Sequence, residues 1–176
     1  MDFAAVLSAI AADMDRHELR YAVVGGIALA GLGMPRTTID LDIVTDAEAQ
    51  AHVVAFLEGL GFETVHRSAA YSNHLHREPA LGRVDVVYVR RDTAEQLFAS
   101  VQRVPGPGGL DMPVPAAEHL VAMKVLAMKN DPRREPQELV DIRFLLARPD
   151  VDREQVREYF LRHGLLKQLH DVERDL

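Results

Sequence analysis

Two aspartates stand two positions apart inside the apolar run RTTIDLDIVT. Asp40 and Asp42 alternate with Ile39, Leu41 and Ile43. Alternation along a strand predicts that both carboxylates share one face while the three apolar side chains enter the core. Strands disfavour aspartate, and two like charges this close repel each other unless a cation compensates them. The pair therefore predicts a site for Mg²⁺ or Mn²⁺, which prefer carboxylate oxygen ligands.

A third acidic residue, Asp85, stands between Val84 and Val86 in the run RVDVVYV, which predicts a second strand. Three converging carboxylates suit two-metal phosphoryl transfer, with Asp40, Asp42 and Asp85 as metal ligands and Asp85 activating an acceptor hydroxyl. The alternative is that these strands are half exposed and that the aspartates simply face water. For any single aspartate in a strand, this alternative is the better explanation. We prefer the catalytic interpretation because strands disfavour aspartate and all three lie between apolar residues.

Two consecutive glycines, Gly25 and Gly26, follow the apolar run YAVV and precede an apolar helical segment. Backbone amides at a strand-to-helix turn can bind phosphate, and glycine lets a ligand approach the main chain. Many such turns use glycine for geometry alone, but this pair stands shortly before the two aspartates. Arg36 and Thr38 lie between and are expected to contact phosphates or carboxylates, with an exposed Arg36 as the alternative.

Together these residues resemble the nucleotidyltransferase superfamily, which has the DNA polymerase β-like fold. Its signature is an apolar strand, Gly-Gly or Gly-Ser, a short helix, an Asp-x-Asp strand and a later carboxylate. Gly25-Gly26, Asp40-Leu41-Asp42 and Asp85 match it here. The run GGIALAGLGMPRTTIDLDIV is similar to one branch, the AbiEii and MenT-like toxins of type IV toxin–antitoxin systems.

The resemblance implies a metal-bound nucleoside triphosphate, such as ATP, and transfer of its nucleoside monophosphate to an acceptor. In relatives that acceptor is the 3′ end of tRNA, a protein hydroxyl or a small molecule such as an aminoglycoside. The toxin branch also implies a cognate antitoxin protein as a partner. Two alternatives stay open: a small-molecule nucleotidyltransferase, and a non-catalytic binding component of the same fold.

The toxin branch carries a lysine on a helix after the core and an aspartate further along, and Lys124 and Asp141 stand in that order. The resemblance implies that Lys124 contacts the triphosphate and assists catalysis. Alternatively, the Lys124 side chain extends to the surface and its ammonium group faces water. Asp141 is expected either to pair with Lys124 or to face water. The chain has Gln137-Glu138 where the branch has a basic residue and an aspartate, although Glu138 keeps a carboxylate. The implied nucleotide-binding residues are Gly25, Gly26, Arg36, Thr38, Lys124 and Asp141.

The elements that must position these residues predict an α+β fold, with a mixed β-sheet flanked by helices and a small C-terminal helical unit. The resemblance implies that this is the nucleotidyltransferase fold. The run VPGPGGLDMPVP excludes a continuous helix or central strand. It separates a catalytic core, 1–110, from a helical region, 111–176, that is expected to complete the nucleotide site. Hydrophobic periodicity predicts helices at 2–18, 47–59, 116–129, 138–147 and 153–169, strands at 21–24 and 38–45, and a hairpin within 62–91.

Composition limits the function classes. Hydrophobic residues make up 48% and charged residues 27% of the 176 positions, which is typical of a folded globular protein. The absence of cysteine excludes thiol nucleophiles and cysteine-type zinc sites, and the net charge of −7 argues against broad binding to nucleic acid. The first residues do not resemble a secretory signal, and the longest uncharged stretch, 21–34, is too short to span a bilayer. A cytoplasmic protein without a membrane segment is expected.

His74 and His76 share a strand face in the run SNHLHRE and could bind metal with a third ligand. If this run pairs with RVDVVYV, one of the histidines would approach Asp85. Two surface histidines are the simpler expectation.

Overall fold

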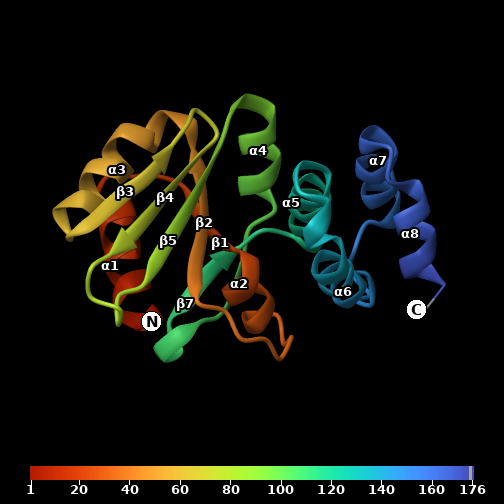
Figure 1. Ribbon diagram of the computed structural model, residues 1–176, viewed down its shortest axis with the longest axis horizontal. Helices are drawn as coiled ribbons and strands as arrows, with labels where there is room; N and C mark the ends of the chain where they lie inside the picture. The colour runs from red at the N-terminus through yellow and green to blue at the C-terminus, as the bar shows by residue number, and fades with distance from the viewer. Residues whose placement is uncertain (175) are drawn as a thin grey trace. The chain divides into compact units, whose positions relative to one another are not determined.

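The chain folds into two units, residues 1–115 and 116–176, and the computed structural model describes residues 1–174 and 176 (Figure 1). The boundary after Pro115 differs from the expected one after residue 110. Strand β6 (Gln102–Pro105) pairs in antiparallel register with β7 (Asp111–Val114), so residues 111–114 belong to the first unit. The proline- and glycine-rich run therefore forms a small two-stranded hairpin as well as dividing the chain.

A five-stranded mixed sheet is the centre of the first unit, in the order β1-β2-β5-β4-β3. Strands β2 and β5 are parallel, and the other neighbours are antiparallel. The predicted hairpin is the β4–β5 pair, and the predicted mixed α+β fold is confirmed. The strands are β1 (Tyr21–Val24), β2 (Asp40–Asp46), β3 (Phe62–Arg67), β4 (Tyr71–His76) and β5 (Arg83–Val89).

Helices α1 and α3 lie side by side against one face of this sheet (Figure 1). The Thr64 hydroxyl on β3 donates to the Glu58 carboxylate on α3 at 2.7 Å, which fixes the face that α3 covers. Sequence periodicity did not predict α4 or the separate strand β3. The helices of this unit are α1 (Phe3–Arg16), α2 (Gly25–Gly31), α3 (Gln50–Gly59) and α4 (Arg91–Ala99), with short 3₁₀ turns η1 (Ala47–Ala49) and η2 (Pro107–Gly109).

Strand alternation on β2 places Leu41 and Ile43 fully in the core, as expected. The same expectation is wrong for Ile39, whose side chain is 81% exposed. The strand begins only at Asp40, so Ile39 lies in the preceding loop and does not share the pleat. The two aspartates consequently stand at the start of the strand, with half-buried side chains.

The second unit consists of helices, as predicted. One expected helix, 153–169, is interrupted because Gly164 adopts a left-handed conformation with φ 72° and ends α7. The Leu165 N–H then donates to the Phe160 carbonyl at 2.9 Å, which closes the helix end. Within the described residues 1–174 and 176, none of the helices has the length and apolar character to cross a membrane. The elements are α5 (Ala117–Asn130), η3 (Pro132–Arg134), α6 (Glu135–Leu146), α7 (Arg153–His163) and α8 (Leu166–Glu173).

Candidate metal and nucleotide site

Three carboxylates converge on the sheet face opposite α3. The parallel register pairs Asp42 with Asp85, and Asp40 precedes Asp42 by two residues on the same face. One carboxylate oxygen from each residue lies within 4.8 Å of the others, and all three side chains are half-buried. An all-oxygen, acidic set of this kind fits a hard divalent cation such as Mg²⁺ or Mn²⁺.

Neighbouring polar groups orient these carboxylates. The Thr38 hydroxyl donates to Asp40 Oδ1 at 2.7 Å. Asp85 Oδ1 accepts from Asn73 Nδ2 at 2.8 Å and from Arg83 Nε at 2.7 Å. The hydrogen bond to Asp85 raises the pKa of Arg83, and the charges of Asp40 and Asp42 act in the same direction. Arg83 therefore offsets part of the repulsion among the three aspartates.

Sequence reasoning missed Asn73 and Arg83 as neighbours of the site. Arg83 stands two residues before Asp85 on β5, so strand alternation alone could have found it. Asn73 pairs directly with Asp85 across the β4–β5 hairpin. Its position depends on the register of that hairpin, which the sequence did not determine.

The two glycines lie in contact with the acidic side chains. Gly25 has a left-handed φ of 64°, and a Cβ there would lie 2.7 Å from Cγ of Asp42. A Cβ on Gly26 would lie 2.7 Å from Cβ of Thr38. Any larger residue at either position would displace a side chain of the site. The Gly-Gly pair is thus required by the packing of the acidic residues, whatever its contacts with phosphate.

Replacing Gly25 by Ala is expected to lower the free energy of unfolding by about 1–3 kcal/mol, because strain at positive φ adds to the overlap with Asp42. Gly59→Ala is the matched control, since Gly59 lies at the end of α3 with open space around it. That control is expected to be neutral or slightly stabilising. Urea unfolding of both variants measures the difference, and equal stabilities would contradict the packing argument.

His74 does not join the carboxylates, and the expectation of a surface histidine is wrong. It pairs with Val84 in the β4–β5 register, so its side chain lies on the face opposite Asp85 and is fully buried. There, Ser72 Oγ lies 2.7 Å from its Nε2 and Thr64 Oγ1 lies 3.1 Å from its Nδ1. Ser72 Oγ also lies 2.7 Å from the hydroxyl of Tyr88. His76 stands at the end of β4, where its Nε2 lies 3.3 Å from the Leu60 carbonyl oxygen. Neither histidine contacts the acidic cluster.

Burial lowers the pKa of His74, which makes stability pH-dependent. The unfolded chain binds this proton more readily than the folded protein, so the free energy of unfolding falls as pH drops below about 6.5. Urea unfolding at about pH 7.5 and about pH 5.5 is expected to show this loss. His74→Gln should lose less stability than the parent between these values, whereas the exposed control His170→Gln should match the parent. If His74→Gln loses as much unfolding free energy as the parent between the two pH values, the pH dependence comes from other groups.

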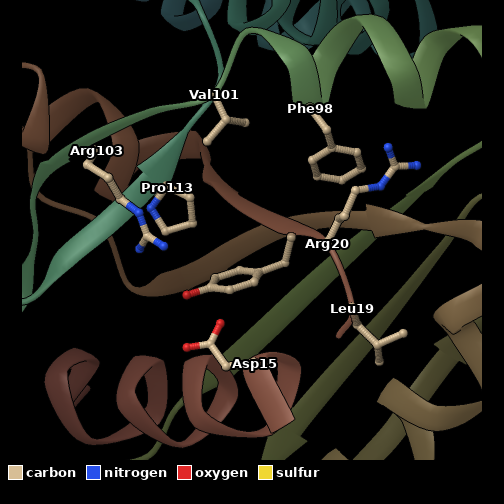
Figure 2. Close-up of a pocket in the computed structure, with 8 residues that line it drawn as sticks. Asp15, Leu19, Arg20, Phe98, Val101, Arg103 and Pro113 are labelled. Atoms are coloured by element: carbon tan, nitrogen blue, oxygen red, sulfur yellow. The ribbon is translucent and has the colours of Figure 1, made fainter. Parts of the chain in front are cut away.

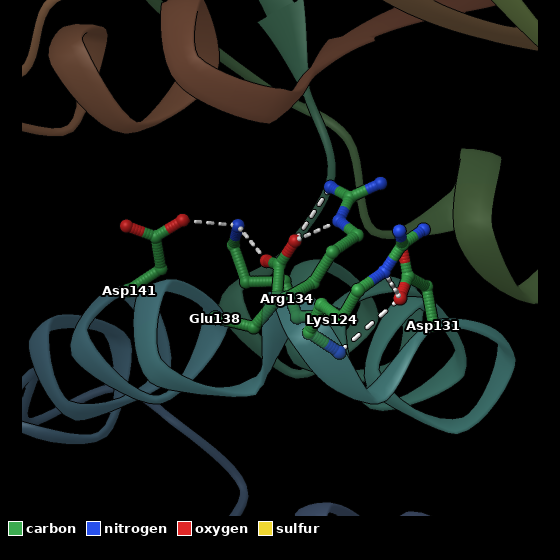
Figure 3. A network of polar contacts seen from close by, with 6 residues as sticks. Lys124, Asp131, Arg134, Glu138 and Asp141 are labelled. Carbon is green, nitrogen blue, oxygen red and sulfur yellow. Dashed lines mark hydrogen bonds and ion pairs between the residues drawn. The ribbon is translucent and has the colours of Figure 1, made fainter.

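In the second unit, Lys124 lies in a buried charged network (Figure 3). Its Nζ donates to Asp141 Oδ2 at 2.5 Å and to Glu138 Oε2 at 2.9 Å. Arg134 donates to the other oxygen of Glu138 through Nε at 2.9 Å. Lys124 is 9% exposed, so it does not reach out to the surface. Two cations face two carboxylates here, which explains how these charges tolerate burial.

A cavity of about 240 Å³ lies elsewhere in the first unit (Figure 2). None of the three converging aspartates lines it. Arg20, on its wall, donates to Asp46 at 2.7 Å and to Glu95 at 2.9 Å, and lies over the Phe98 ring. These contacts give Arg20 a structural role. The lining residues are Asp15, Leu19, Arg20, Tyr21, Phe98, Val101, Arg103 and Pro113.

Solved structures share this fold at low sequence identity. The antibiotic-resistance factor ANT(2″)-Ia is 20% identical and has a TM-score of 0.69, covering 97% of this chain and 99% of its own. A nucleotidyltransferase-like protein from Paracoccidioides brasiliensis is 17% identical with a TM-score of 0.62, covering 98% and 91%. The lincosamide antibiotic adenylyltransferase LnuA, bound to lincomycin, is 18% identical with a TM-score of 0.58, covering 80% and 94%.

A search of curated protein sequences finds no match to this chain. A family model does match, over residues 6–176, and therefore spans both units. Its description is the nucleotidyl transferase AbiEii toxin of Type IV TA systems. With the nucleotidyltransferase fold and the converging aspartates, this match shows that the chain belongs to the AbiEii family of nucleotidyltransferase toxins.

Proposed function

We propose that this chain transfers a nucleoside monophosphate from a nucleoside triphosphate to an acceptor, with Mg²⁺ or Mn²⁺ held by Asp40, Asp42 and Asp85. The convergence of their carboxylate oxygens within 4.8 Å is the observation that supports this most directly. When bound, the ions supply activation of the attacking oxygen and charge stabilisation for the leaving pyrophosphate. A cytoplasmic location, where nucleoside triphosphates are abundant, is part of the proposal.

The proposal gives the residues around the acidic cluster separate tasks. Asp85 orients the acceptor hydroxyl and receives its proton, while Asn73 and Arg83 hold Asp85 Oδ1 in place. Thr38 holds Asp40 in the same manner. The backbone amides at Gly25 and Gly26 approach the triphosphate. Roles for Arg36, Lys124 and Asp141 in nucleotide binding, and the completion of the nucleotide site by the second unit, stay predictions of the family resemblance.

We further propose that the acceptor is the 3′ end of tRNA or a protein hydroxyl, and that a cognate antitoxin controls the activity. Membership of a toxin family supports this choice. The net charge of −7 means that tRNA would have to be recognised through a local contact rather than the field of the whole protein.

A small-molecule acceptor is the second candidate. The fold likeness to ANT(2″)-Ia and to lincomycin-bound LnuA supports it, since both are antibiotic-resistance or antibiotic-modifying proteins by description. A non-catalytic binding role is the third candidate, and the intact set of three carboxylates argues against it. Isolation of a stable protein partner together with absent nucleotide turnover would favour that third candidate.

The test is incubation of the purified full chain with Mg²⁺ and each of four α-³²P-labelled nucleoside triphosphates. Total tRNA, lysate protein and aminoglycosides serve as separate acceptors, and chelation of the metal is the control. Label in the tRNA or protein fraction that requires metal supports the proposal. Label only in the aminoglycoside fraction supports the second candidate. No label in any fraction, from folded protein with metal present, would contradict catalysis by the chain alone.

A further inference from the structure

A second cluster of metal-ligating side chains lies on the other side of the sheet. It consists of Asp13 in α1, His17 just after α1 and His52 in α3. One ligand atom from each lies within 4.8 Å of the others. Asp13 Oδ2 lies 2.7 Å from His52 Nε2, and Asp13 Oδ1 lies 3.3 Å from His17 Nδ1. His17 Nδ1 also lies 2.9 Å from the backbone carbonyl oxygen of Asp13. Each carboxylate oxygen of Asp13 thus lies near a different imidazole.

The helices place these side chains together. Asp13 and His17 are four residues apart, which brings them to the same side of successive helical turns. His52 contacts them from α3. This helix lies beside α1, on the sheet face opposite the cluster of Asp40, Asp42 and Asp85. The His17 and His52 rings stand with their centroids 4.2 Å apart. The cluster is therefore built on α1, the turn that directly follows it, and α3.

The Asp13 carboxylate is buried, and hydrogen bonds or a nearby positive charge stabilise a buried carboxylate. Its carboxylate belongs to a residue that is 5% exposed, whereas the side chains of His17 and His52 are 42% and 34% exposed. The Arg16 guanidinium is 4.0 Å away and 71% exposed, so its charge is strongly screened by water. An imidazole adds positive charge only when it is protonated. A divalent cation would compensate the carboxylate at any pH at which the imidazoles are unprotonated.

We propose that Asp13, His17 and His52 bind a transition-metal ion of the Zn²⁺ class that joins α1 to α3. Two imidazoles and one carboxylate favour Zn²⁺ over Mg²⁺, which prefers oxygen ligands. Zn²⁺ is bound by nitrogen and oxygen at about 2.0–2.2 Å, so the three side chains would have to close around the ion. In doing so, His17 Nδ1 would exchange its contact with the Asp13 carbonyl oxygen, at 2.9 Å, for the metal. Water completes the coordination at the exposed side. The site is independent of the proposed transfer reaction.

The test measures Zn²⁺ binding to the 176-residue chain by calorimetry, with Co²⁺ absorption as a spectroscopic report on the ligands. Measurements are made on Asp42→Asn protein, in which the cluster of Asp40, Asp42 and Asp85 has lost one carboxylate and should compete less for Zn²⁺. His52→Gln removes the imidazole but keeps an amide near Asp13. His17→Asn likewise replaces the imidazole of His17 with an amide. His66→Gln is the matched control because His66 is exposed on β3, away from the cluster.

One Zn²⁺ per chain is expected, with a raised unfolding midpoint and visible Co²⁺ bands. His52→Gln and His17→Asn should each weaken Zn²⁺ binding by more than about tenfold, the scale on which even indirect partners of a metal act. His66→Gln should bind like the parent. Absence of Zn²⁺ binding, or undiminished binding in both histidine variants, overturns the proposal. If His52→Gln fails to fold, His17→Asn decides the outcome by itself.

Discussion

Replacing Asp42 by Asn is expected to reduce nucleotidyl transfer by at least about a hundredfold while leaving the fold intact. The substitution keeps the volume of the side chain and removes one negative charge from the centre of the acidic cluster. Asp42 pairs with Asp85 across β2 and β5 and lies against Gly25, so its position is fixed on two sides. Loss of this charge weakens the proposed metal site without opening a cavity.

Stability supplies the second measurement for this variant. Because like charges repel in the absence of metal, Asp42→Asn should unfold at the same temperature as the parent or slightly above it. Asp46→Asn is the matched control, since Asp46 lies on the same strand but binds Arg20 and is remote from the cluster. The control should retain transfer activity and lose no more than about 1 kcal/mol of stability. Full activity in Asp42→Asn would refute the assignment of the acidic cluster as the active site.

Replacing Lys124 by Met is expected to lower the free energy of unfolding by about 3–5 kcal/mol. The change removes the cation that lies between Glu138 and Asp141, both of which are almost fully buried. Arg134 continues to bind Glu138, but both carboxylates lose the ammonium group of Lys124. Urea unfolding followed by far-ultraviolet circular dichroism measures the loss, because the second unit is built from helices.

Lys129→Met is the control for this change, since Lys129 lies exposed in the last turn of the same helix. It should alter the free energy of unfolding by less than about 0.5 kcal/mol. Activity separates the two roles that have been predicted for Lys124. Reduced stability with transfer retained at low temperature would make it a structural residue only. Unchanged stability with transfer lost would leave the triphosphate contact as its sole role.

The sequence by itself determined the main functional hypothesis. Aspartates between apolar strand residues are costly without a reason, so Asp40, Asp42 and Asp85 were recognisable from residue type and spacing alone. Their shared face follows from the period of two along a strand, and the parallel pairing of β2 with β5 agrees with it. The helical second unit also followed from periodicity. The pairing of Lys124 with Asp141 was one of two options for residues that the family resemblance singled out.

Only the tertiary structure decided which groups meet across elements. The register of the β4–β5 hairpin directs Asn73 toward Asp85 and His74 into the core, and a shift of one residue would exchange them. The contact of Asp13 with His52 depends on the packing of α1 against α3, between residues far apart in the chain. Local spacing carries no information about such contacts, because the angle and depth of packing are set by the whole core.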